Sequence, residues 1–459
     1  MLFLPEKIAA IPSMQVRGKV SRIVGLIVEG SCPPSTIGSL CEITPLDEGK
    51  PVAAEIVGYN DNKALLMPLG ELRGLGPGSR ISIRKENATI RVGDAMLGRV
   101  IDAMEQPLDG RPLVIPQVEM PLYALPPGPM ERKKIGQPLD LGICAINALL
   151  TCGQGQRMGI MAGSGVGKSV LLGMMARYAR ADVNVIALIG ERGREVREFV
   201  ERDLGEEGLK RSIIVAVTSD QSPLLRMRGA FVATAIAEYY CRQGKDVLLM
   251  MDSVTRFAMA MREIGLAVGE PPTTKGYTPS VFAMLPKLLE RAGSFQGQGS
   301  ITGLYTVLVE GDDLTEPVAD AVRSILDGHI VLSRDLAARN HYPAIDVLQS
   351  TSRVMRDIVP ARHRDLAGKL RAVLATYRDN EDLINIGAYS TGSNKKIDYA
   401  ISKIDDITAF LQQGYDESSS LELSLNAMAT VVSDRQESER RRTDRRDRDR
   451  RGSQSEAND

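Results

Sequence analysis

Residues 162–169, AGSGVGKS, have the residue types and spacing of a phosphate-binding loop, with Ala162 where the usual pattern has its first glycine. The apolar segment RMGIM precedes the loop and the helical run SVLLGMMARYAR follows it. In this strand–loop–helix arrangement, backbone N–H groups can surround phosphate oxygens at a helix N-terminus, where the helix dipole favours anions. Lys168 would add positive charge beside the β- and γ-phosphates, and the Ser169 hydroxyl could ligate Mg²⁺. The expected nucleotide-binding residues are Gly163, Ser164, Gly165, Val166, Gly167, Lys168 and Ser169.

Two carboxylates end later apolar segments. Asp252 ends DVLLMMD, where it could hold the Mg²⁺ shell, although a strand-terminal Asp alone is more often a helix cap. Glu191 follows VNVIALIG, at the sheet edge where open α/β folds bind ligands. It could deprotonate the water that attacks a γ-phosphate, or it could simply be stabilised by the next helix N-terminus. Arg192 and Arg256 could meet phosphate charge or form ordinary surface ion pairs.

The segments that must position these residues differ along the chain. Short β segments with Gly and Pro turns predict an N-terminal β-barrel over residues 1–90, followed by a Pro-rich connector over 91–141. Apolar runs alternating with helical segments predict an α/β core with a parallel sheet over 142–359. Residues 360–433 have helical periodicity and predict a helical C-terminal domain, and the mixed-charge tail 434–459 is expected to be disordered.

Composition excludes several classes of protein. Lysine and arginine total 57 against 58 acidic residues, so no global charge indicates a nucleic-acid partner. The five cysteines form no CxxC pair, which is typical of reduced, mostly buried thiols in a cytosolic protein. No apolar run approaches the roughly 20 residues of a spanning helix. Any membrane contact is therefore expected to be peripheral.

Several motifs then occur in a fixed order: AGSGVGKS, IGERGRE, DSVTRF, GDDLTEPVAD and YPAIDVLQSTSR. Together they resemble the hexameric rotary-type ATPases, which include the F- and V-type catalytic subunits and the type III protein-export ATPases. Within that family, LTCGQGQRMGIMAGSGVGKSVLLGMMAR and DGHIVLSRDLAARNHYPAIDVL look like the flagellum-specific export branch. The resemblance covers nearly the whole chain. It implies a RecA-like P-loop core between an N-terminal β-barrel and a C-terminal helical domain.

The resemblance also implies roles for individual residues. Lys168 and Ser169 match the groups that bind phosphate and Mg²⁺, and Glu191 resembles the catalytic base. Tyr342 matches the aromatic residue that packs on adenine, and Arg353 matches the arginine finger offered to the γ-phosphate of the neighbouring subunit. The other residues expected in the site are Arg192 and Arg256 as catalytic groups and Asp252 as a metal ligand.

The function implied by the resemblance is hydrolysis of Mg-ATP to ADP and phosphate by a cytoplasmic homohexamer that drives flagellar protein export. Its expected partners are the flagellar export apparatus, export chaperones, exported flagellar proteins and a stator-like regulatory protein. It would contact the membrane export gate peripherally, at the cytoplasmic face of the inner membrane. No nucleic-acid partner is expected.

Alternatives remain. An injectisome secretion ATPase and the catalytic subunit of an ion-translocating rotary ATPase share the same chemistry. A Rho-type nucleic-acid translocase would need an aromatic RNA-binding N-terminal domain, yet residues 1–100 hold only Phe3 and Tyr59 as aromatics. A non-enzymatic nucleotide-binding scaffold would leave the co-occurrence of Glu191, Asp252 and Arg353 unexplained.

Overall fold

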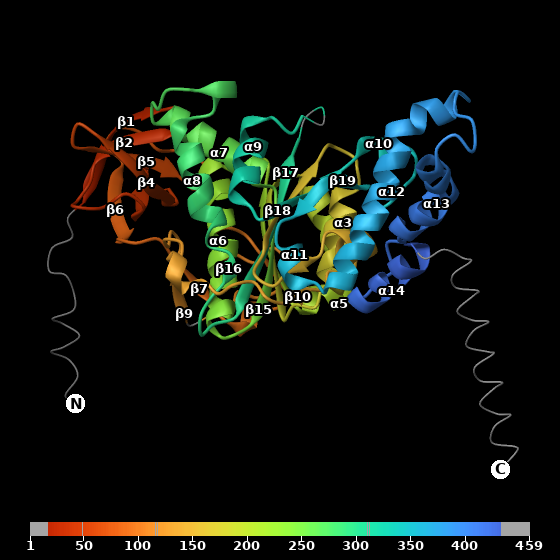
Figure 1. Ribbon diagram of the computed structural model, residues 1–459. Coiled ribbons are helices and arrows are strands. Elements are labelled where there is room, and N and C mark those ends of the chain that lie inside the picture. Colours follow the sequence, from red (N-terminus) through yellow and green to blue (C-terminus); the bar gives the residue numbers. More distant parts are fainter. Residues whose placement is uncertain are drawn as a thin grey trace, which may run out of the picture.

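An antiparallel β-barrel forms one end of the molecule (Figure 1). The computed structural model describes residues 17–432 apart from positions 48, 115, 117, 310 and 312. Six strands close in the order β1-β2-β5-β4-β3-β6, and alternate apolar side chains such as Ala54 and Ile56 fill the interior. The strands are β1 (Gly18–Val24), β2 (Ile27–Ser31), β3 (Leu40–Thr44), β4 (Val52–Asn60), β5 (Lys63–Pro68) and β6 (Arg80–Lys85). The predicted barrel is confirmed, while residues 1–16 of its predicted range lie outside the described residues.

A largely parallel sheet forms the centre, in the order β19-β18-β12-β17-β15-β13-β14-β8. β19 pairs antiparallel with β18, and the short β16 pairs antiparallel with β17. The strands are β8 (Arg99–Ile101), β12 (Arg157–Ala162), β13 (Val183–Glu191), β14 (Ser212–Thr218), β15 (Asp246–Asp252), β16 (Gly293–Ser294), β17 (Ser300–Leu308), β18 (Gly328–Leu332) and β19 (Ile345–Ser352). The predicted α/β core with its parallel sheet is confirmed.

Helices cover both faces of this sheet, which explains why its strands are apolar throughout. Along β13, Val185 and Ala187 face one apolar core, whereas Ile186 and Leu188 face the other. The helices after the phosphate loop are α3 (Lys168–Tyr178), α4 (Gly193–Glu198), α5 (Gly205–Lys210), α6 (Pro223–Arg242), α7 (Val254–Ala267), α8 (Pro279–Leu289), α9 (Pro317–Ile325) and α10 (Arg334–Ala338). A π-helical turn, η3 (Phe199–Leu204), joins α4 to α5.

The segment between barrel and core is more structured than its proline content suggests. β7 (Thr89–Val92) and β9 (Val118–Pro121) pair with each other, and the short β10 (Pro138–Leu139) pairs with β11 (Cys152–Gly153). β8 adds a parallel strand to the central sheet beside β14. Part of the predicted connector therefore belongs to the core. Three residues are too few to show a strand pattern in the sequence.

Helices form the opposite end of the molecule (Figure 1). They are α11 (Met355–Ile358), α12 (Ala361–Asn385), α13 (Lys395–Leu411) and α14 (Leu421–Val432), and the last two pack near α2 (Cys144–Leu149). None of the helices between residues 17 and 432 is both long enough and apolar enough to cross a membrane. The charged tail 434–459 lies outside the described residues, so its predicted disorder stays a prediction.

Candidate active site

The phosphate loop joins the end of β12 to the start of α3, as its sequence pattern predicts. Gly165 and Gly167 have φ values of +79° and +88°, a left-handed conformation that residues with a Cβ rarely adopt. A Cβ on Gly167 would also lie 3.3 Å from Cε1 of Tyr342. Ser169 is exposed in the first turn of α3. The loop therefore has the glycine conformations that its sequence pattern predicts, and the Ser169 hydroxyl is accessible at the start of the helix that follows.

Lys168 lies between two carboxylates. β13 and β15 are adjacent parallel strands, so Glu191 and Asp252 end at the same edge of the sheet. Lys168 Nζ lies 2.5 Å from Asp252 Oδ1 and 3.5 Å from Glu191 Oε1. The Thr306 hydroxyl, on β17, donates to Asp252 Oδ1 at 2.7 Å. The structure thus brings together three residues that are far apart in sequence, and it adds Thr306, whose role the sequence did not indicate.

Burial and charge set the protonation of this cluster. Burial alone would lower the pKa of Lys168, but the charges of Asp252 and Glu191 outweigh it, so the pKa lies above its ordinary value. Burial, reinforced by the charge of Asp252, raises the pKa of Glu191 to about 7. Glu191 Oε1 is a buried oxygen that accepts no hydrogen bond from the described residues. A carboxylate in this condition is suited to accept a proton near neutral pH.

Two of the three predicted arginines, Arg192 and Arg256, occupy different environments near Glu191. Arg192 precedes α4 with its side chain 78% exposed, and its Nη1 lies 3.7 Å from Glu195 Oε1. Arg256, in the first turn of α7, lies against the backbone at Gly190, where a Cβ would be 3.0 Å from the Arg256 Cβ. Its buried Nε has no hydrogen-bond partner among the described residues. Arg256 is therefore held beside Glu191, whereas Arg192 stands at the rim.

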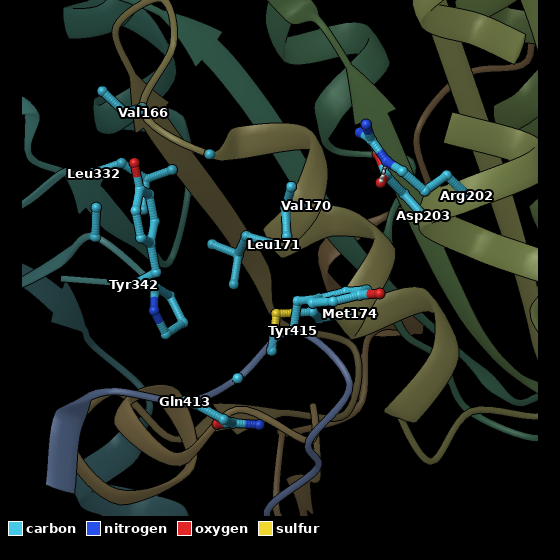
Figure 2. Close-up of a pocket in the computed structure, with 14 residues that line it drawn as sticks. Val166, Val170, Leu171, Met174, Arg202, Asp203, Leu332, Tyr342, Gln413 and Tyr415 are labelled. Carbon is cyan, nitrogen blue, oxygen red and sulfur yellow. Dashed lines mark hydrogen bonds and ion pairs between the residues drawn. The ribbon is translucent and has the colours of Figure 1, made fainter. Parts of the chain in front are cut away.

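An apolar cavity of about 560 Å³ adjoins the phosphate loop (Figure 2). Val166, Val170, Leu171 and Met174 form its α3 side. Tyr342, which is 42% exposed, and Tyr415 reach the cavity from separate segments (Figure 2). Sequence reasoning missed Tyr415, because its only signal is a single aromatic residue in the QQGYD turn between α13 and α14.

Arg353 lies away from this cluster. β19 begins beside the phosphate-loop end of β12, because Ile345 pairs with Leu332 and Leu332 with Ala162. It then runs antiparallel for eight residues, about 26 Å, to the opposite edge of the sheet. There the exposed Arg353 donates from Nη2 to the Arg323 carbonyl at 3.3 Å. The arginine is thus placed far from the Lys168 of its own chain.

Family comparisons agree with this architecture. Residues 142–352 match the nucleotide-binding domain of the ATP synthase alpha/beta family, and residues 359–430 match the T3SS EscN ATPase C-terminal domain. A flagellum-specific ATP synthase of Bacillus subtilis is 53% identical over 422 residues, which are 91% of this chain and 96% of that protein. This chain belongs to the ATP synthase alpha/beta family. The predicted family is confirmed, and the chain is a P-loop ATPase.

Members of the secretion branch are similarly close. A type 3 secretion system ATPase of Xanthomonas euvesicatoria is 49% identical over 94% of this chain and 97% of its own length. The structure of assembled EscN from enteropathogenic E. coli superposes with a TM-score of 0.86 at 47% identity, covering 91% of this chain and 100% of that one. The order of barrel, nucleotide-binding core and helical domain is therefore that of this branch of the family.

Proposed function

We propose that this chain is the ATPase of a flagellar type III export system, coupling hydrolysis of Mg-ATP in a homohexamer to export of flagellar proteins. The observation that carries the proposal is the Lys168–Glu191–Asp252 cluster. The flagellum-specific relatives of Bacillus subtilis and Salmonella typhimurium are 53% and 50% identical and match more than nine-tenths of this chain. An injectisome ATPase is the nearest alternative, since the Xanthomonas relative is 49% identical.

The chemistry follows from the groups around the phosphate loop. Backbone N–H groups of residues 163–169 would hold the phosphates, and Lys168 would exchange its carboxylate partners for phosphate oxygens. Glu191, released from Lys168, would orient a water molecule and accept its proton as the water oxygen bonds to the γ-phosphorus and the bond to the β-phosphate bridging oxygen breaks. Arg256, held beside Glu191, and Arg192 at the rim would meet the charge on the phosphates.

The residues present also fit Mg²⁺. Oxygen is the donor that Mg²⁺ prefers, and the exposed Ser169 hydroxyl and the Asp252 carboxylate supply it at the phosphate edge. Thr306 donates to Asp252 Oδ1 and thereby orients the carboxylate. When bound, Mg²⁺ would neutralise charge on the β- and γ-phosphates.

The remaining site residues would serve the adenine and the contact between subunits. Tyr342 and Tyr415 flank the apolar cavity and would hold the adenine. Arg353 lies at the opposite edge of the sheet, from which it would act on the phosphates of a neighbouring subunit. The similar structures of assembled EscN and of EscN in complex with its central stalk EscO support the proposal that this chain also assembles. The proposed partners are export-gate, chaperone, regulatory and cargo proteins at the cytoplasmic face of the inner membrane.

Gene deletion and complementation would test the export role. Cells that lack this chain should make no flagellar filament and should not secrete filament protein. The wild-type gene should restore both, and a Glu191→Gln gene should restore neither. If deletion instead removed secretion by an injectisome and left the filaments intact, the alternative function would replace the flagellar one.

The raised pKa of Glu191 predicts how activity depends on pH. Because the base works only as the carboxylate and its pKa is about 7, kcat/KM should fall as the pH drops through 7 and level off above it. Initial rates of phosphate release between pH 5.5 and 9 would measure the profile. A constant kcat/KM from pH 6 to 8 would count against Glu191 as the base.

A further inference from the structure

Two buried amide side chains hold the loop that carries Tyr415. Asn147 Nδ2 donates to the Ser419 carbonyl at 2.8 Å, and Gln413 lies two residues before Tyr415. Gln413 Oε1 accepts a hydrogen bond from the Cys144 N–H at 2.8 Å. Its Nε2 donates to the carbonyls of Gly142 at 2.9 Å and Glu417 at 2.8 Å. The acceptor and both donors of the side chain are therefore occupied.

The backbone of Gln413 makes the connection to the other side of the cavity. Its N–H donates to the Tyr342 carbonyl at 3.0 Å. A single residue thus joins the Tyr415 loop to residues 142–144 at the start of the core and to the segment that carries Tyr342. The neighbouring Gln412 follows the last residue of α13 and is exposed. Among the described residues, its side chain makes no hydrogen bond to the core.

Tyr415 itself is held on the α3 side by Arg177. Arg177 Nη2 donates to the Tyr415 carbonyl at 2.5 Å, and its guanidinium lies 5.6 Å from the centroid of the Tyr415 ring. Tyr415 is nevertheless 54% exposed, so little packing fixes its side chain. The position of Tyr415 at the cavity therefore depends on how firmly its loop is bonded to the core. Gln413 makes the buried hydrogen bonds before Tyr415, and Ser419 is bonded to Gly142 and Asn147 after it.

We propose that Gln413 is a positioning residue for the nucleobase. It fixes the Tyr415 loop relative to Tyr342, so that the apolar cavity between the two segments is shaped to receive a flat base. It acts through Tyr415 and leaves the phosphate loop unaffected. The inference rests on the proposed function in one respect, because it takes this cavity as the nucleobase site.

The test compares a ligand that has a base with one that does not. Gln413→Ala would leave buried partners unpaired and free the loop, so the Kd for ADP should rise about tenfold. The Kd for inorganic pyrophosphate, measured by competition with a fluorescent ADP, should change less than about twofold, because it reports the phosphate loop alone. Gln412→Ala is the matched control and should change neither constant.

A double-mutant cycle tests whether Gln413 acts through the aromatic ring. Tyr415→Ala should weaken ADP binding, and adding Gln413→Ala to it should weaken binding by less than about a further twofold. Fully multiplicative effects would overturn the assignment, as would an equal loss of pyrophosphate affinity. If Gln413→Ala does not fold, Gln413→Glu serves instead, because it keeps the shape and the acceptor but loses both donors.

These measurements separate the inference from the export role. All of them use the full chain and read binding, so they do not depend on secretion. A chain that binds ADP through Gln413 and Tyr415 but fails to restore filaments would overturn the proposed function and leave the positioning role standing. The reverse result would leave the export role intact and remove the role of Gln413.

Discussion

Lys168→Ala should abolish ATP hydrolysis and weaken nucleotide binding together. Lys168 is the cation between Asp252 and Glu191 in the free chain, and it is part of the phosphate loop itself. Removing a preorganised group of this kind from a phosphoryl-transfer site costs on the order of 10² to 10³ in turnover. Binding should also suffer, because two carboxylates at the phosphate edge would then face the nucleotide without compensation.

The measurement is phosphate release alongside the Kd for ADP. Lys245→Ala is a suitable control, since Lys245 is an exposed lysine in the turn before β15, at the opposite edge of the sheet. An active Lys168→Ala protein would contradict the phosphate-loop assignment. A protein that binds ADP normally but does not turn over would show that Lys168 acts only in the transition state.

The sequence predicted best where a local pattern decides the structure. Five strands of the central sheet are buried on both faces and are therefore continuous apolar runs: β12, β13, β14, β15 and β17. Runs of this kind can be recognised from the sequence alone. The glycines of the phosphate loop were equally informative. Glycine adopts positive φ without steric cost, and Gly165 and Gly167 have positive φ in the structure. These patterns predict Lys168 in the loop, Glu191 at an edge of the sheet and Asp252 at the end of a strand.

The sequence predicted least where distant segments meet. Residues 341–353 were not predicted as a strand, because β19 carries the buried polar residues Asp346 and Ser350 in place of an apolar run. Asp346 is paired with Arg378 on α12 at 3.0 Å, and that partner cannot be read from local sequence. Gln413 and Tyr415 were not predicted for the same reason. Gln413 is bonded to Tyr342 and Gly142, and Tyr415 lines a cavity together with Tyr342, which lies far away in sequence.

Arg353→Ala is the second change with a large expected effect. Arg353 follows β19 at the edge of the sheet opposite to the phosphate loop of its own chain, so its loss should leave the Kd for ADP within about twofold. Turnover should fall by roughly 10³, which is the effect of losing an arginine supplied in trans. Arg353→Lys should restore little activity, because an ammonium group lacks the planar fork of the guanidinium. Arg356→Ala, which removes an exposed arginine three residues further on, is the control.

Mixing two inactive variants gives the sharpest form of this prediction. A site built from the phosphate loop of an Arg353→Ala subunit and the arginine of a Lys168→Ala subunit is complete, whereas each variant alone has no complete site. In rings assembled at random from equal amounts, about a quarter of the head-to-tail interfaces should therefore be intact. Phosphate release should reappear on mixing and should rise with protein concentration as rings assemble. If the mixture stayed inactive while rings formed, or if Arg353→Ala lost ADP binding as well as turnover, Arg353 would have a structural role within its own subunit.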